Sequence, residues 1–277
     1  MENKLHLYLR SCVILTFLSA LLVLLFFSFS FLPETAVATT NAPSSIRELA
    51  TNANQGDPTL TETDDLGQEY IDKITFLGES TTYGLQRYGL LSNHQVWTGA
   101  TCTDGRVKSA GTLSLSPSID KTRIYYPETG EALTVGEALA RKHPEYLVIT
   151  LGLNNGASYY SEDEFKQCYR ILLNAVVEAS EDTTVILQSL FPVADTCKIK
   201  AYTPERIRLC NTWICDLASE YEMYYLDTIS VLSNTNGYLY AEYDNGGDGI
   251  HLNGMGLAVV LSYVRTHGIQ APEEVVS

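Results

Sequence analysis

Three short stretches of the 277-residue chain carry residue types that together could catalyse acyl transfer. In the first, residues 76–82, an apolar run ends at Gly78 and leads directly to Ser80. A serine becomes a nucleophile when a base removes its proton, and the amino end of a helix favours the negative charge that develops. Because a serine after a strand is common in ordinary turns, this stretch gains its meaning from the other two.

The second stretch, residues 248–253, offers a base and a partner for it. Imidazole exchanges protons near neutral pH, and a carboxylate can hold its second nitrogen. Asp248 lies three residues before His251, so a loop can bring the carboxylate onto the ring. The alternative is that Asp248 caps a turn and His251 lies at the surface. No other histidine beyond the amino-terminal apolar run has an acid within its three preceding positions, so His251 is the best candidate base.

The third stretch is Gly152-Leu153-Asn154, which follows a near-continuous apolar run typical of a strand buried on both faces. Acyl transfer passes through a tetrahedral oxyanion, and a fixed amide donor can stabilise it by a few kcal/mol. Asn and Gly also favour strand-ending turns for local reasons, so an ordinary turn is the alternative.

Taken together, Gly-x-Ser early, Gly-x-Asn in the middle and Asp-x-x-His near the end resemble the SGNH (GDSL-type) hydrolases over about residues 72–266. The resemblance implies a three-layer α/β/α, flavodoxin-like fold with a mainly parallel sheet, and an esterase that needs no cofactor and no metal. It implies that Ser80 is the nucleophile, His251 the base and Asp248 its orienting acid.

The same resemblance implies an oxyanion hole built from the Ser80 backbone N–H, Asn154 and a glycine between the first two motifs. Gly111 is our choice for that glycine and Gly99 is the alternative. The sequence departs from the family at Glu79, where the family usually has Asp. The carboxylate is kept but reaches further than that of an aspartate would.

Other hydrolase classes fit less well. The unrelated α/β-hydrolase fold uses Gly-x-Ser-x-Gly, and Thr82 stands where its second glycine should be. A metal hydrolase is disfavoured because no His, Asp or Glu cluster with ligand spacing accompanies His251. With 33 acidic against 18 basic side chains the chain carries a formal charge of −15, which argues against a nucleic-acid partner.

The order of the predicted elements indicates a parallel, three-layer α/β domain, because strands alternate with helices. A hairpin, residues 123–126 with 132–135, interrupts this order and is expected near the sheet edge. The predicted strands are residues 71–77, 146–151, 184–191 and 223–226, and the predicted helices are residues 81–91, 136–143, 161–179, 203–220 and 253–266. The helix from 161 begins with a capping box, Ser161 with Glu164.

The amino terminus predicts export. Residues 1–33 hold an uncharged apolar run, 11–32, behind Lys4 and Arg10, which is long enough to span a bilayer with the amino end in the cytoplasm. Residues 34–68 are expected to be a flexible extracellular tether, and residues 69–277 the catalytic domain. The protein would be a single-pass membrane protein with its catalytic domain outside, or secreted if cleaved near Ala38.

Five cysteines follow the apolar run, and none makes a Cys-x-x-Cys pair, so no structural zinc site is indicated. If any pair forms in an oxidising exterior, Cys197 and Cys210 are the nearest plausible couple, although buried thiols are the commoner explanation for such positions.

The expected substrate is a short acyl ester, in particular an O-acetyl ester on cell-wall or extracellular carbohydrate. Tyr238, Tyr240 and Tyr243 could form a wall for a sugar, or could fill a loop core. A lipase or lysophospholipase, an acyltransferase using the same serine, and a non-catalytic glycan-binding surface domain remain alternatives. Activity should rise with pH as the imidazole loses its proton, since the base must be neutral to act.

Overall fold

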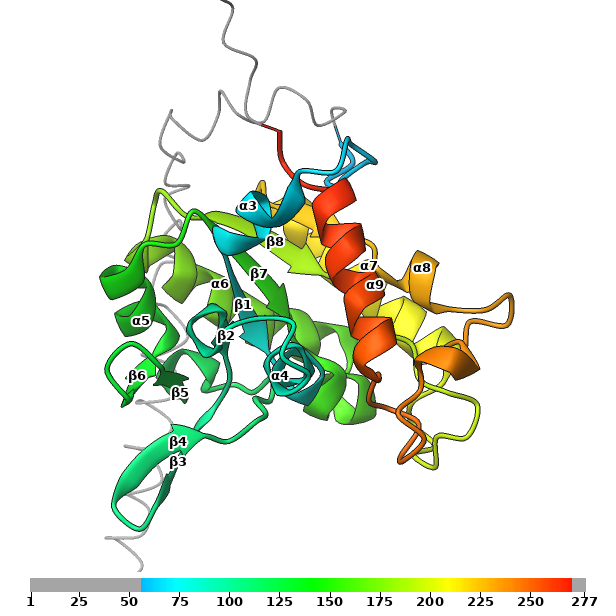
Figure 1. Ribbon diagram of the computed structural model, residues 1–277, viewed down its shortest axis with the longest axis horizontal. Coiled ribbons are helices and arrows are strands. Elements are labelled where there is room, and N and C mark those ends of the chain that lie inside the picture. The colour runs from blue at the N-terminus through cyan, green and yellow to red at the C-terminus, as the bar shows by residue number, and fades with distance from the viewer. Residues whose placement is uncertain (1–55, 271–277) are drawn as a thin grey trace, which may run out of the picture. The chain divides into compact units, whose positions relative to one another are not determined.

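The computed structural model describes residues 56–270, whose centre is a five-stranded parallel sheet (Figure 1). Its strand order is β2-β1-β7-β8-β9, and every neighbouring pair is parallel. The strands are β1 (Ile74–Gly78), β2 (Val96–Trp97), β7 (Tyr146–Thr150), β8 (Thr184–Gln188) and β9 (Tyr224–Leu226). The predicted α/β fold with a mainly parallel sheet is confirmed.

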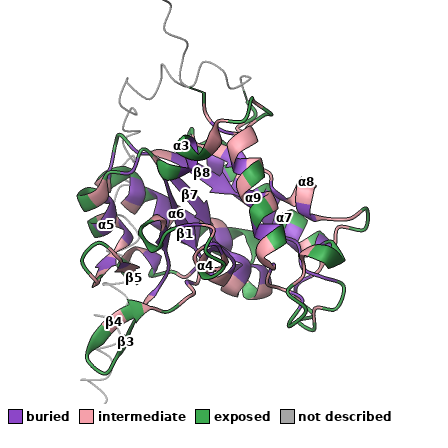
Figure 2. Ribbon diagram, viewed as in Figure 1, coloured by how far each residue is buried: buried purple, intermediate pink, exposed green. Residues whose placement is uncertain are grey.

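Helices cover both faces of the sheet and make three layers. The first covering group is α5 (Val135–Lys142), α6 (Glu162–Ala179) and α7 (Pro204–Glu220), and the second is α3 (Gly67–Asp72), α4 (Ser80–Arg87) and α9 (Gly254–Thr266). Along β7, Leu147 and Ile149 face the first group while Val148 faces the second. Figure 2 shows the strands as the buried centre between these layers.

Local capping signals define the long helices. Ser161 caps α6 and accepts from the Glu164 N–H, while the Glu164 side chain accepts from the Ser161 N–H, so the predicted capping box is confirmed. Thr203 caps α7 and Asn253 caps α9 through their side-chain oxygens. Each cap supplies an acceptor to an N–H that the helix itself cannot pair.

The predicted first strand begins too early. Ile71 lies in α3, and β1 begins only at Ile74. Both residues are buried, and a short apolar run does not distinguish a buried strand from one turn of buried helix. The helix α4 also ends at Arg87, before the predicted end at residue 91, because the chain turns at Gly89 with a φ of 69°.

Two hairpins flank the sheet. The predicted one is confirmed as β5 (Arg123–Tyr126) paired antiparallel with β6 (Glu131–Thr134). The other, β3 (Ala100–Thr103) with β4 (Arg106–Ser109), projects from the fold and was not predicted (Figure 1). The remaining helical segments among the described residues are short: Asn93–Gln95, Ile119–Lys121, Leu153–Ala157, Ile229–Leu232 and Ala241–Tyr243. Within Leu153–Ala157 the backbone of Asn154 and Asn155 is not helical.

The segment before α3 lies on the domain. Leu60 N–H donates to the Tyr225 carbonyl, and Thr63 N–H to that of Thr266. Contacts with the folded domain therefore begin before residue 69, within the part predicted as tether. The predicted membrane segment and the cleavage site near Ala38 lie outside the described residues. Between residues 56 and 270, no helix combines the length and the apolar character needed to span a membrane.

The five cysteines after the apolar run are all free thiols, so the Cys197–Cys210 couple does not form in this structure. Cys168 and Cys210 are buried.

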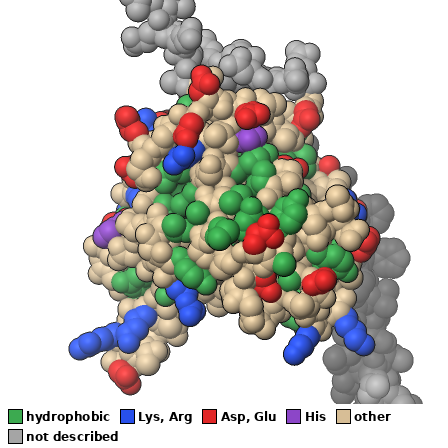
Figure 3. Space-filling view, turned by 45° about the vertical axis from the view of Figure 1, so that its right-hand side comes forward, with side chains coloured by type: hydrophobic (Ala, Val, Ile, Leu, Met, Phe, Trp, Pro, Cys, Tyr) green, Lys and Arg blue, Asp and Glu red, His purple; other side chains and the backbone are tan. Residues whose placement is uncertain are grey.

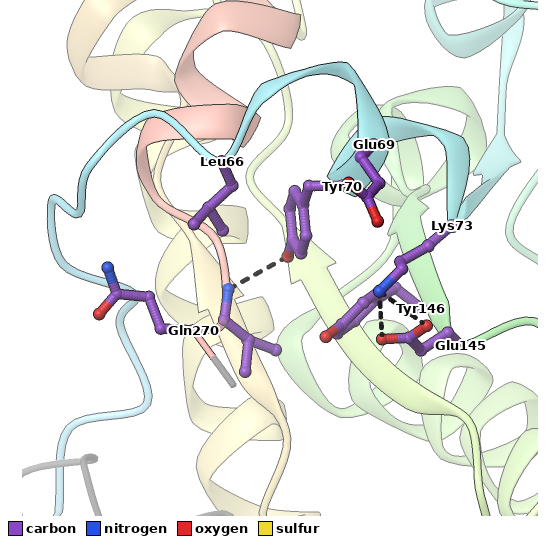
Figure 4. Close-up of a pocket in the computed structure, with 8 residues that line it drawn as sticks. Leu66, Glu69, Tyr70, Lys73, Glu145, Tyr146 and Gln270 are labelled. Carbon is purple, nitrogen blue, oxygen red and sulfur yellow. Dashed lines mark hydrogen bonds and ion pairs between the residues drawn. The ribbon is translucent and has the colours of Figure 1, made fainter. Parts of the chain in front are cut away.

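A pocket lies at the amino-terminal edge of the sheet, where β1 and β7 begin (Figure 4). The Tyr70 hydroxyl accepts from the Ile269 N–H at 3.2 Å, and the Tyr70 ring packs against Tyr146. The Lys73 ammonium lies 3.4 Å from the Glu145 carboxylate. Because Ser80 and Asn154 follow the carboxyl ends of the same two strands, this pocket is separate from the candidate site.

Candidate active site

Ser80 is the first residue of α4, directly after β1, so it lies at the carboxyl edge of the sheet and at a helix amino terminus. Gly78 allows this close turn: a Cβ on it would lie 2.4 Å from the Thr150 carbonyl oxygen and 2.2 Å from the Thr82 hydroxyl. Only glycine fits there. The short apolar strand and its glycine therefore deliver the hydroxyl to the edge where ligands of parallel α/β sheets bind.

The structure brings Ser80, His251 and Asp248 together in one chain of hydrogen bonds. The Nε2 atom of His251 lies 2.8 Å from the Ser80 Oγ, and its Nδ1 lies 2.7 Å from the Asp248 Oδ2. These are hydrogen-bond distances on both ring nitrogens, which is the arrangement that a serine nucleophile, a base and an orienting acid require. Their catalytic roles remain predictions.

The loop itself holds Asp248 in place. Its Oδ1 accepts from the backbone N–H groups of Ile250, at 2.8 Å, and His251, at 3.1 Å. Burial raises the pKa of Asp248, but the bonds from Ile250 and His251 outweigh it, so the pKa lies below its ordinary value. Asp248 is therefore an anion at neutral pH and can stabilise a protonated His251 ring.

Asn154 follows β7 and is half-buried, but its amide already has partners. Its Nδ2 donates to the Thr112 Oγ1 at 3.1 Å and to the Leu113 carbonyl at 3.2 Å. These bonds join the third motif to the segment that holds Gly111. To serve an oxyanion, the amide would share or exchange one of these bonds.

The two candidate glycines differ in what their N–H groups do. Gly99 N–H donates to the Thr112 carbonyl at 2.7 Å and so belongs to a backbone pairing. Gly111 N–H donates to the Ser109 hydroxyl at 3.0 Å, and a Cβ on Gly111 would come within 3.2 Å of the Tyr83 ring. A side-chain hydroxyl is more easily displaced than a backbone ladder, which favours Gly111 as the oxyanion donor.

Glu79 is the residue whose importance the sequence showed only as a departure from the family. Its carboxylate is buried and accepts from three successive N–H groups, those of Gly152, Leu153 and Asn154, at 2.5, 2.6 and 2.7 Å. Burial raises its pKa to about 7, although each of these bonds lowers it. The longer Glu side chain therefore ties the turn before Ser80 to the loop that carries Asn154.

Ser109 and Thr112 were missed by the sequence analysis. Ser109 also lies 2.7 Å from the Thr98 hydroxyl, so it connects the β3–β4 hairpin to the candidate oxyanion segment. Its position two residues before Gly111 was the only available signal.

The arrangement allows a complete acyl-transfer step. Attack by the Ser80 Oγ on an ester carbonyl would pass the hydroxyl proton to the His251 Nε2, which can return it to the leaving alcohol. The carbonyl oxygen would gain negative charge near the amino end of α4. Within residues 56–270, no group of His, Cys, Asp or Glu side chains is arranged to hold a metal ion.

Comparison with known proteins identifies the family. The model of the GDSL-like lipase/acylhydrolase family matches residues 76–259 of the 277. No curated protein matches the chain.

Several solved structures are similar to this chain. One is a GDSL-like lipase from Bacteroides thetaiotaomicron, with 18% identity and a TM-score of 0.43 over 72% of this chain and 90% of that one. Another is a carbohydrate esterase of family 3 from Talaromyces cellulolyticus, with 17% identity and a TM-score of 0.43 over 69% and 93%. A mutant acetyl-xylooligosaccharide esterase from Geobacillus has 16% identity and a TM-score of 0.41 over 71% and 94%.

The matched range, residues 76–259, spans the positions of Ser80, Asn154, Asp248 and His251, whose roles stay predictions. The chain thus belongs to the GDSL-like lipase/acylhydrolase family of ester-hydrolysing enzymes.

Proposed function

We propose that this protein is an exported serine esterase that removes short acyl groups, in particular O-acetyl groups, from cell-wall or extracellular carbohydrate. Ser80 acts as nucleophile, His251 as general base and Asp248 as its orienting acid, and the backbone N–H of Ser80 contributes to the oxyanion hole with Asn154 and Gly111.

The observation that carries the proposal is the pair of hydrogen bonds on His251, 2.8 Å to the Ser80 Oγ and 2.7 Å to the Asp248 Oδ2. The first residue of α4 and a loop far from it in the sequence supply these groups. A surface histidine with a turn-capping aspartate would not need a serine hydroxyl on its second nitrogen, so this geometry favours catalysis over that alternative.

The exposure of the site supports a bulky alcohol. The side chains of His251 and Asp248 are 34% and 46% exposed, which leaves room for a substrate whose alcohol is part of a polymer. Tyr240 and Tyr243 meet edge to face at 5.8 Å, and the Tyr243 carbonyl accepts from the Asn253 N–H next to the His251 loop. The Tyr243 ring packs against the core, whereas Tyr240 is 38% exposed, so we propose Tyr240 as the ring that contacts a sugar.

Surface composition and the amino terminus complete the proposal. Figure 3 shows hydrophobic side chains gathered in the middle of one face, with acidic groups around them. Near the candidate site, Met255 is 60% exposed and the Tyr88 ring lies against Gly254.

The apolar run of residues 11–32 supports export, with the enzyme anchored or cleaved near Ala38.

The test uses a soluble form of the protein that begins near Thr39 and compares its activity on esters with short and long acyl chains. Nitrophenyl acetate and nitrophenyl palmitate are assayed side by side, with Ser80→Ala as the inactive control. We expect rapid turnover of nitrophenyl acetate, which is lost in Ser80→Ala, and slow turnover of nitrophenyl palmitate. In a second assay we expect the protein to release acetate from acetylated xylan or peptidoglycan.

Three outcomes would redirect the proposal. Faster turnover of palmitate would favour a lipase. Acetate transfer to an added sugar in place of release into water would favour an acyltransferase. A folded protein with no turnover of either ester would favour a non-catalytic glycan-binding domain.

A further inference from the structure

The loop after β7 adopts a backbone conformation that it would not keep by itself. Gly152 has a φ of 125°, and a Cβ there would lie 2.8 Å from the Phe165 ring. Asn155 has a φ of 65° and a ψ of −53°, which is unfavourable for a residue with a side chain. Since Asn154 lies between these two residues, the position of its amide depends on what holds the loop.

One side of the loop is held by the side chain of Glu79, which is an anion at pH values above its pKa of about 7. The N–H groups of Gly152, Leu153 and Asn154 converge on the buried Glu79 carboxylate. Successive N–H groups that point to one place form a concavity that binds anions, and here the anion belongs to the residue before the nucleophile.

The other side of the loop is held by a positive charge from a different helix. Arg206, in the first turn of α7, donates from Nε to the Ala157 carbonyl at 2.9 Å and from Nη2 to the Gly156 carbonyl at 3.1 Å. Its Nη2 also donates to the Tyr160 carbonyl. The guanidinium lies 4.9 Å from the centre of the Trp213 ring. Among the described residues no carboxylate forms an ion pair with Arg206, so its charge interacts with these carbonyl oxygens.

We propose that Arg206 is a positioning residue for ester hydrolysis, acting with Glu79 as a clamp that holds residues 152–160 and thereby aims the Asn154 amide. The inference rests on the proposed function, because it takes Asn154 as an oxyanion donor. The clamp is complementary to the peptide dipoles: the carboxylate meets N–H groups and the guanidinium meets carbonyl oxygens.

The shape of the guanidinium explains why an arginine serves here. Its planar fork can reach three carbonyls at once, whereas the ammonium of a lysine is a compact charge on a flexible stem. Arg206→Lys should therefore keep the charge and lose most of the positioning. Arg206→Gln should lose both.

The first test measures kcat and KM for nitrophenyl acetate in Arg206→Gln, Arg206→Lys and the matched control Arg208→Gln. Arg208 lies on the same helix and is exposed. We expect kcat to fall about tenfold in Arg206→Gln with little change in KM, because the oxyanion develops after binding. The kcat of Arg206→Lys should lie between those of Arg206→Gln and the parent, and the kcat of Arg208→Gln should equal that of the parent.

The second test combines Arg206→Gln with Asn154→Ala. If Arg206 acts through the amide, the double variant should be no slower than Asn154→Ala alone, since the group being aimed is already absent. Losses that multiply would show that Arg206 acts independently of Asn154 and would overturn the proposal. Full activity in Arg206→Gln would overturn it as well.

Controls separate this inference from the proposed function. Thermal unfolding by circular dichroism shows whether each variant is folded, and Arg206→Lys carries the test if Arg206→Gln is not. An Asn154→Ala variant at full rate would overturn the clamp while leaving the serine esterase intact. Turnover that persists in Ser80→Ala would instead contradict the proposed function itself.

Discussion

The two ends of strands β1 and β7 place charged side chains in opposite settings. At the amino-terminal edge, the ammonium of Lys73 and the carboxylate of Glu145 lie 3.4 Å apart with side chains 45% and 51% exposed (Figure 4). At the carboxyl edge, Glu79 is only 2% exposed and is held by three backbone N–H groups in place of a cation.

The difference shows which of the two charged sites the structure constrains more strongly. Water screens the exposed pair, so its net contribution to stability is small. A buried carboxylate has lost its water and depends on the loop that replaces it, so the loop and the carboxylate specify each other. The same strands thus end in a tolerant surface on one side and in a constrained site on the other.

The largest expected effect is at the carboxyl edge. We expect His251→Ala to lower kcat for nitrophenyl acetate by a factor on the order of 10⁴, because the serine loses its base. Lys73→Ala, at the other edge, should leave kcat unchanged. Full activity in His251→Ala would mean that the base has been assigned wrongly.

Glu79→Gln should change how stability depends on pH. Because burial raises the pKa of Glu79 from 4.5 to about 7, the folded protein holds its proton over a range where the unfolded chain has released it. Its stabilisation is therefore fully present below pH 4.5 and is lost as pH rises through about 7. At about 1.4 kcal/mol per pH unit this amounts to about 3 kcal/mol.

Urea unfolding at pH 4.5 and pH 8 measures this effect. Between these two pH values the free energy of unfolding should fall by about 3 kcal/mol more in the parent than in Glu79→Gln. Parallel losses in the two proteins would show that the proton on Glu79 is not linked to folding.

Asn154→Ala removes the predicted amide donor, and we expect kcat to fall about a hundredfold with a smaller change in KM. The amide donor is needed for the charge that develops in the transition state. Its removal also deprives the Thr112 hydroxyl and the Leu113 carbonyl of the hydrogen bonds that Asn154 donates. A large rise in KM at constant kcat would instead indicate a substrate-binding role.

The smallest effect is expected at the amino-terminal edge. Glu145→Ala should lower the free energy of unfolding by less than about 1 kcal/mol, and adding salt should reduce even that difference. A loss of several kcal/mol would erase the contrast between the two edges of the sheet.

Local signals explain how much of the fold could be predicted from the sequence. The capping residues Ser161 and Glu164 and the buried run of β7 act within a few positions, so these elements could be recognised. The β3–β4 hairpin was missed although Asp104-Gly105 forms its turn, with φ of 53° and 71°, because its exposed strands lack an apolar pattern.

The candidate site was predictable where spacing determines it. Asp248 and His251 meet within one loop, whereas their contact with Ser80 was expected only from the resemblance to the family. The partners of Asn154 and Glu79 could not be predicted, since Thr112 lies 42 residues from Asn154 and Gly152 lies 73 from Glu79. Such contacts depend on how separate elements pack.

The central claim is that Ser80 is a nucleophile activated by His251, and covalent labelling tests it most directly. A fluorophosphonate is added to the folded soluble protein, and the modified peptide is identified by mass spectrometry. We predict one phosphonyl group on Ser80, no labelling of Ser80→Ala and much slower labelling of His251→Ala. A folded protein that stays unlabelled, or carries the label on another residue, would contradict the account.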